Sequence, residues 1–69
     1  MKITATINGE KREIEAGLTL AQLLEQFGLT FQSGIAVAVN EAVVPRNALS
    51  EYRPKEGDAI EIIKAVAGG

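Results

Sequence analysis

The segment from Thr19 to Gly28 most constrains the fold, because it has the apolar spacing of one amphipathic helix. Its apolar residues recur at intervals of three and four and form one stripe: Leu20, Leu23, Leu24 and Phe27. Thr19 and Gln22 fit a capping box at its start, and Gly28 fits the left-handed residue that follows a helix end. A helix of about two to three turns is not stable alone in water, so the stripe must pack against a sheet.

The residues before this helix predict a β-hairpin. Lys2–Ile7 alternates with period two and is rich in β-branched residues, which favours a strand. Asn8-Gly9 is a strong signal for a type I′ turn, because both residues tolerate positive φ. The turn predicts that Ile3 faces Ile14 on the core side and that 10–15 forms a polar strand near a sheet edge.

The residues after the helix predict three more strands. The run 35–39 is almost wholly apolar, as expected of a central strand, and Asn40-Glu41 turns the chain into a short strand that Pro45 ends. We expect Leu49 to be a buried anchor in an irregular crossing, and 59–64 to be the last strand. With the first and last strands paired in the middle, this order predicts an α+β protein with a β-grasp fold, a mixed sheet of about five strands around one main helix.

Composition excludes several classes of function. The chain of 69 residues lacks cysteine and histidine, which removes thiolate chemistry and the commonest general base and metal ligand. A net charge of −2 argues against nucleic-acid binding, and no apolar run is long enough to cross a bilayer. We therefore expect a cytoplasmic protein, monomeric when free, that is not an enzyme and binds no metal, cofactor, nucleic acid or membrane.

The last residues, Val66-Ala67-Gly68-Gly69, have two interpretations. They are either an ordinary frayed terminus or a narrow stem, without bulky side chains, that carries a carboxylate into a partner's active site. We expect a β-grasp domain over residues 1–66 and a flexible tail over residues 67–69.

Three stretches resemble the ubiquitin-like sulfur carriers of the ThiS type. The hairpin 36–46 is similar to the family's segment ending in Val-Pro-Arg, here Val44-Pro45-Arg46, and 57–63 is similar to its Gly-Asp-x-Ile-Glu-Ile-Ile strand. The ending of the chain in Gly68-Gly69 matches the usual ending of the family.

The resemblance implies a function in thiamine thiazole biosynthesis. An E1-like adenylyltransferase of the ThiF type would use ATP and magnesium to convert the Gly69 carboxylate into an acyl-adenylate. Sulfur originating from cysteine would then displace AMP and leave a thiocarboxylate at Gly69. Thiazole synthase of the ThiG type would take that sulfur, while Ala67 and Gly68 would occupy the partner's active site.

Candidate docking residues lie elsewhere in the chain. Arg46 matches the family's arginine and is either a partner contact or a solvated loop charge of small energetic value. Ala36, Ala38 and Ile63 are expected to point away from the helix and to form a flat docking face, or simply an exposed sheet face with no function. The carboxylates on 10–15 favour a solvated strand edge over a metal site.

Three alternatives stay open from the residues alone. The first is a carrier of the MoaD type for molybdopterin synthesis, although Ile62-Ile63-Lys64-Ala65 stands where those carriers usually have an aromatic or Pro-Pro stretch. The second is a ubiquitin-like modifier joined through Gly69 to lysines, and the third is a β-grasp binding module with an idle tail.

Overall fold

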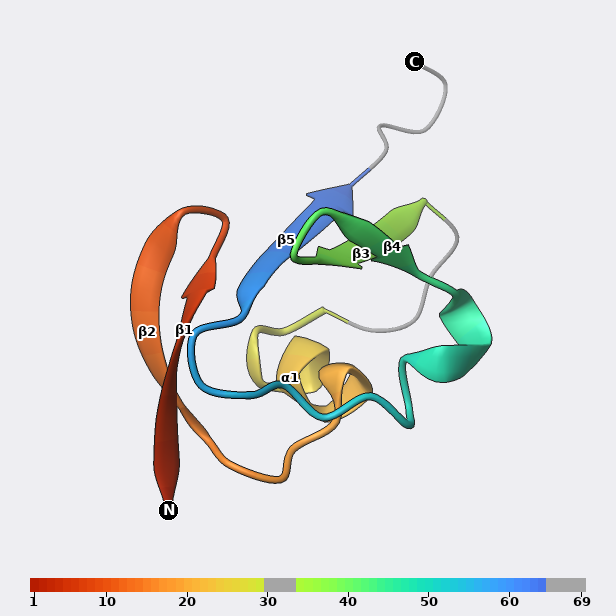
Figure 1. Cartoon of the computed structure of the whole chain (residues 1–69). Helices are drawn as coiled ribbons and strands as arrows, with labels where there is room; N and C mark the ends of the chain where they lie inside the picture. The colour runs from red at the N-terminus through yellow and green to blue at the C-terminus, as the bar shows by residue number, and fades with distance from the viewer. Residues whose placement is uncertain (30–33, 65–69) are drawn as a thin grey trace.

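The computed structural model describes residues 1–29 and 34–64, and these form a mixed sheet with one α-helix on one face (Figure 1). The elements in chain order are β1 (Lys2–Ile7), β2 (Glu10–Glu15), α1 (Leu20–Gln26), β3 (Ile35–Val39), β4 (Ala42–Val44), the 3₁₀ helix η1 (Arg46–Ala48) and β5 (Ala59–Lys64). The order of strands across the sheet is β2-β1-β5-β3-β4. The predicted β-grasp arrangement is confirmed, with β1 and β5 parallel at its centre.

The first hairpin has the predicted turn and register. Asn8 and Gly9 have φ values of 52° and 86°, which a type I′ turn requires, and Ile3 pairs with Ile14. Ile14 is buried and β2 lies at the sheet edge, so the alternating pattern correctly separated the core face from the solvent face.

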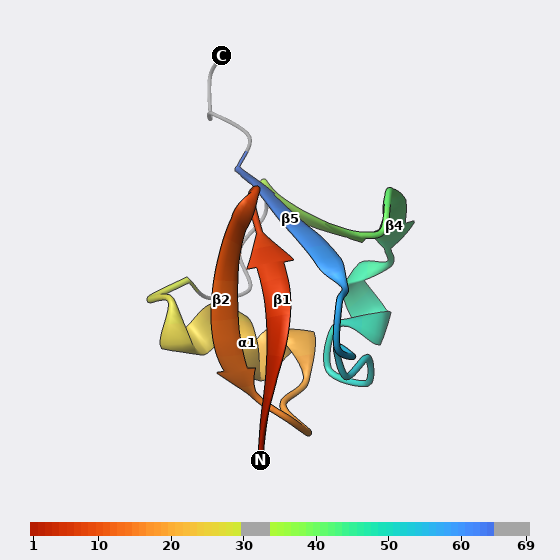
Figure 2. The ribbon, with the colours of Figure 1, turned by 60° about the vertical axis from the view of Figure 1, so that its left-hand side comes forward.

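Helix α1 begins at the predicted cap. The Thr19 N–H donates to Gln22 Oε1 at 2.9 Å, and the Gln22 N–H donates to Thr19 Oγ1 at 3.2 Å. Gly28 follows the helix with φ 77°. Turned by 60°, the molecule shows α1 behind β1 and β2, on one side of the sheet (Figure 2).

The prediction that Phe27 belongs to the buried stripe is wrong. The three leucines of the stripe are buried, whereas Phe27 is 37% exposed. It is the C-cap residue, at the end of the helix, and its ring lies 5.3 Å from the guanidinium carbon of Arg12 on the edge strand. At this end of the helix, the neighbouring strand β2 offers Phe27 only the long cationic side chain of Arg12. A cation is attracted to the face of an aromatic ring, but Arg12 does not bury the ring of Phe27.

One core cluster lies between α1 and the sheet. Its buried members are Ala5, Ile7, Ile14, Leu20, Leu23, Leu24, Val37, Val39, Leu49 and Ile60. Leu49 is the predicted buried anchor of the crossing, and Leu29, just after α1, packs against the cluster.

Candidate functional site

Strand β5 is the element that connects the core to the last five residues. Its first half lies between β1 and β3, where Ile60 is almost fully buried. Its second half, Glu61–Lys64, pairs with β3 only, because β1 ends at Ile7. The strand therefore passes from the middle of the sheet to the point where the chain continues into Ala65.

Two asparagines from hairpin turns hold β5 from opposite sides. Asn8 Oδ1 accepts a hydrogen bond from the Ile62 N–H at 2.8 Å, and Asn40 Oδ1 accepts one from the Ala59 N–H at 3.0 Å. Both asparagines have φ 52°, a left-handed conformation that asparagine tolerates better than most residues. Each turn thus reverses the direction of the chain between two strands and also supplies a hydrogen bond that holds β5 in the sheet.

Asp58 is the polar centre of the loops that precede β5. It is 7% exposed and accepts hydrogen bonds from the Asn40 amide at 3.1 Å, the Tyr52 hydroxyl at 2.9 Å and the Lys55 N–H at 2.9 Å. Burial raises the pKa of Asp58, but these hydrogen bonds and the charge of Lys55 outweigh it and leave the pKa below its ordinary value. Burial and the neighbouring Asp58 carboxylate raise the pKa of Tyr52, so its hydroxyl remains a donor at neutral pH.

These hydrogen bonds around one carboxylate, which we call the Asp58 hub, were missed by the sequence analysis, which considered Asp58 only as part of the ThiS-like stretch 57–63. An available signal was the pairing of an aspartate just before the last apolar strand with an asparagine in the preceding hairpin turn. A buried carboxylate needs several hydrogen-bond donors. Periodicity along the chain could not identify the Asn40 amide, 18 residues away, as one of them.

The predicted reactive residue and its stem, Gly69 with Ala67 and Gly68, lie outside the described residues. The boundary predicted between a domain at 1–66 and a tail at 67–69 lies there too and stays a prediction.

Three of the four predicted docking residues, Ala36, Ala38 and Ile63, lie in the sheet and point to its face opposite α1, but the prediction for Ala38 needs a correction. Val37 and Val39 are buried against the helix side, so Ala36 and Ala38 point to the other face, where Ile63 is 53% exposed. Ala38, however, is only 6% exposed, because it lies between Val43 and Glu61, whose longer side chains flank its methyl group. It therefore offers no docking surface.

Three exposed apolar residues of this face, on β3, β4 and β5, form what we call the outer patch: Ala36, Val43 and Ile63. The sequence analysis missed Val43, which is 71% exposed. Arg46 is exposed at the start of η1, two positions after the last residue of β4, and within the described residues its side chain makes no ion pair.

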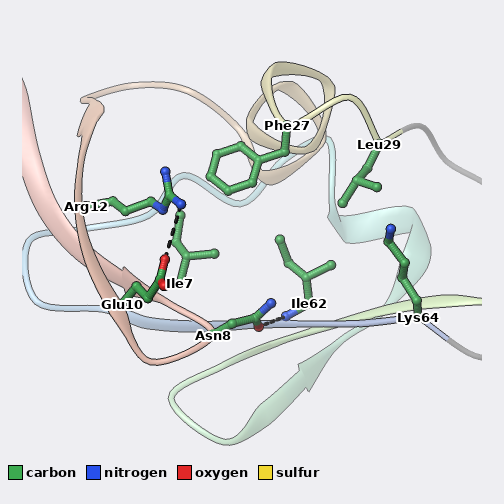
Figure 3. A pocket seen from close by; sticks show the side chains of 8 residues that line it. All are labelled: Ile7, Asn8, Glu10, Arg12, Phe27, Leu29, Ile62 and Lys64. Carbon is green, nitrogen blue, oxygen red and sulfur yellow. Dashed lines mark hydrogen bonds and ion pairs between the residues drawn. The ribbon is translucent and has the colours of Figure 1, made fainter.

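A groove lies on the helix side of the sheet, between the first hairpin, the end of α1 and the second half of β5 (Figure 3). Its volume is about 570 Å³, and its lining residues are Ile7, Asn8, Glu10, Arg12, Phe27, Leu29, Ile62 and Lys64. Figure 3 shows Ile7 and Ile62 on its floor, with Arg12 and Lys64 at opposite ends. No sequence motif predicted this groove.

The described residues contain no cluster of three or more acidic side chains that could hold a metal ion. Glu10 pairs instead with Arg12 at 3.2 Å, and Glu15 with the amino terminus at 3.4 Å, both on the surface. Among the described residues, no helix is long and apolar enough to span a membrane.

Comparison with known proteins decides the family. The sequence model of the ThiS family matches residues 5–69. The chain belongs to the ThiS family. It is 36% identical to the sulfur carrier protein ThiS of Escherichia coli over 90% of this chain and 92% of that protein. The crystal structure of a thiamine biosynthesis protein (ThiS) from Geobacter metallireducens superposes with a TM-score of 0.79 at 26% identity, over 97% of this chain and 100% of that one.

Two thiazole synthases also contain a segment similar to this ThiS-family chain. The synthase of Paramagnetospirillum magneticum is 33% identical over 91% of this chain, and that of Magnetococcus marinus is 38% identical over 91%. In each case the similar segment makes up 19% of the synthase. A ThiS-like sequence and a thiazole synthase thus share one polypeptide in those organisms.

Proposed function

We propose that this ThiS-family chain is a sulfur carrier whose Gly69 carboxylate is converted into a thiocarboxylate that supplies sulfur for a thiazole ring. The observation that carries the proposal is its similarity, across nearly the full length of both chains, to a protein named as a sulfur carrier. The two terminal glycines of the sequence supply the chemical group, a main-chain carboxylate on a stem of small residues.

The chemistry follows from the properties of that carboxylate. With a pKa of about 3.3–3.7 it is ionised at neutral pH, so an oxygen can attack the α-phosphorus of ATP and release pyrophosphate. The magnesium that accompanies ATP belongs to the activating enzyme. In the acyl-adenylate the carbonyl carbon bears AMP as a leaving group, and a sulfur nucleophile equivalent to hydrosulfide attacks that carbon. AMP leaves with the bonding electron pair, and a thiocarboxylate and a proton remain.

The fold contributes a fixed origin for the tail. Strand β5 is buried at Ile60 and held by Asn8 and Asn40, so the chain leaves the sheet from a defined strand. Ala67 and Gly68 then add little bulk between that strand and Gly69, which suits entry into a narrow active site. The carrier in this proposal supplies a shape and a reactive group, and its partners supply catalysis.

The proposed sulfur acceptor is a thiazole synthase of the ThiG type. Two thiazole synthases include a segment similar to this chain, which supports a working partnership between the two kinds of protein. Joining two interacting parts raises the effective concentration of one for the other without any new contact. Where carrier and synthase are separate chains, a docking surface between them must instead bring the two proteins together.

The proposed activating enzyme is an E1-like adenylyltransferase of the ThiF type, and the outer patch is its proposed docking surface. We expect Val43→Asp and Ile63→Asp each to weaken binding to this enzyme about tenfold or more, since each places a charge in an apolar interface. Titration calorimetry with the separate enzyme measures this effect. Gln26→Asp introduces the same charge at an exposed position of α1, on the opposite side of the sheet, and this control should bind within about twofold of the unmodified chain. Unchanged binding of both outer-patch variants would remove the outer patch from the interface.

Intact mass spectrometry tests the carrier chemistry directly. The chain is incubated with the adenylyltransferase, ATP, magnesium and a sulfide source, and the expected product is heavier by the mass of one sulfur minus one oxygen. Fragmentation should locate this gain at Gly69. A chain that keeps its original mass, while the Escherichia coli carrier reacts in parallel with its own enzyme, would refute the proposal.

A further inference from the structure

The second half of β5 has an open backbone edge beside the groove. Asp58 and Ile60 accept hydrogen bonds from the β1 side through their carbonyl groups, and the Ile62 N–H donates to Asn8 Oδ1 on that same side. Backbone groups alternate in direction along a strand, so the Ile62 carbonyl and the Lys64 N–H also face this side. Neither group has a hydrogen-bond partner within the part of the chain that the structure describes.

The groove next to this edge combines apolar and cationic side chains. Phe27 and Leu29 line its helix side, and Ile62 lies on its floor. Arg12 at one end is partly neutralised by Glu10 at 3.2 Å, whereas Lys64 at the other end has no ion-pair partner among the described residues. The groove therefore carries a net positive charge next to a strip of apolar surface.

An open strand edge and an apolar groove beside it are the two elements of recognition by strand addition. An added strand gains affinity from main-chain hydrogen bonds and specificity from alternate side chains that enter the neighbouring pockets. In this groove, the added strand would place an apolar side chain against Phe27 and Leu29. It would place an acidic side chain near Lys64, because opposite charges are complementary across an interface.

We propose that this groove binds an extended segment of the thiazole synthase, which pairs with β5 at Ile62 and Lys64 and places an acidic and an apolar side chain in the groove. The inference rests on the proposed function and adds the surface by which the acceptor enzyme is recognised. The synthase is the chosen occupant because a ThiS-like segment and a synthase occur in one polypeptide. The groove lies next to β5, whose last residue, Lys64, precedes Gly69 by only five positions in the sequence.

The groove and the outer patch lie on opposite faces of the sheet. Ile62, on the groove side, and Ile63, in the outer patch, are neighbours along β5 and point in opposite directions. Two enzymes would thus recognise different faces of the same strand, and variants in one surface should leave binding at the other unchanged.

The test uses two variants in the groove and one matched control. Phe27→Ala removes the partly exposed ring, and Lys64→Glu reverses the charge at the end of β5. Lys11→Glu makes the same charge reversal at an exposed position opposite Thr6, on the far face of the sheet. Calorimetric titration with the full thiazole synthase should give about tenfold weaker binding for each groove variant and a change within about twofold for Lys11→Glu.

Hydrogen exchange distinguishes strand addition from simple contact. The amide hydrogen of Lys64 in the unmodified chain should exchange at least about tenfold more slowly when the synthase is bound, while thermal melting of each free variant checks that its fold is retained. Groove variants that bind like the unmodified chain, an equal loss of binding in Lys11→Glu, or unprotected Lys64 would each overturn the inference. If sulfur transfer persists in that case, the proposed function stands; if the unmodified chain neither binds the synthase nor transfers sulfur, the proposed function fails as well.

Discussion

A chain extended by one alanine after Gly69 is expected to form no detectable thiocarboxylate. The extension turns the Gly69 carboxylate into an amide, which cannot attack ATP, and moves the only terminal carboxylate onto a residue with a Cβ. Five residues of the sequence separate the added residue from the end of β5 at Lys64, so we expect thermal unfolding to be unchanged. Intact mass after incubation with the activating enzyme and sulfide measures the loss.

The matched control adds one alanine before Met1. It gives the same mass change at the opposite end of the chain, where the amino terminus forms only an exposed pair with Glu15. This control should gain sulfur at the rate of the unmodified chain. Sulfur incorporation in the chain extended after Gly69 would show that the reactive group is not the Gly69 carboxylate.

Asp58→Ala is expected to lower the free energy of unfolding by roughly 2–3 kcal/mol, because the Asn40 amide, the Tyr52 hydroxyl and the Lys55 N–H all lose the buried carboxylate that accepts their hydrogen bonds. Such a loss is large for a domain of this size, whose total stability is modest. Urea denaturation followed by circular dichroism measures it. Glu61→Ala, an exposed acidic position on β5, is the control and should change stability by less than about 0.5 kcal/mol.

The contribution of Asp58 should also depend on pH in a defined direction. Its pKa is lowered in the folded protein, so the folded state binds this proton less readily than the unfolded state. The stabilisation is fully present above the unfolded pKa of about 3.9 and is lost as the pH falls through the lower folded value. The difference in stability between the unmodified chain and Asp58→Asn should therefore shrink in acid; a difference that is constant from neutral pH to well below pH 4 would contradict this account.

The parts of the fold that depend on local chemistry were predictable from the sequence. Asn8-Gly9 fixed the type of turn, the turn fixed the register, and the register placed Ile3 and Ile14 on the core face. Thr19 and Gln22 likewise fixed the first turn of α1. In both the turn and the capping box, the interacting residues lie a few positions apart, so a short stretch of sequence includes every residue that takes part.

The errors arose where exposure depends on neighbours from other strands. Phe27 continues the apolar period of the helix but lies at its end, beyond the cover of the sheet. Ala38 points to the outer face as predicted, yet its neighbours Val43 and Glu61 cover it. Periodicity gives the direction of a side chain, whereas its exposed area depends on the size of residues that pair with it across the sheet.

The groove and the Asp58 hub were beyond sequence reasoning for a related reason. The groove needs the first hairpin, the helix end and β5 in their final positions before Phe27 and Lys64 line one surface. The hub gathers a turn asparagine, a loop tyrosine and a backbone amide around one carboxylate. By contrast, the role proposed for Gly69 rests on sequence and family alone.

The parallel pairing of β1 with β5 has a consequence for how the chain folds as it is made. Thr6 and Ile7 are among the first residues synthesised, and they pair with Ala59 and Ile60 near the end of the chain. Pairings this distant in sequence form slowly, and the centre of the sheet stays incomplete until β5 has left the ribosome. The strand that completes the core is also the strand that leads into residues 65–69. Under the proposed function, a translation product truncated before β5 therefore lacks both the completed core and Gly69, and would not compete for the proposed activating enzyme.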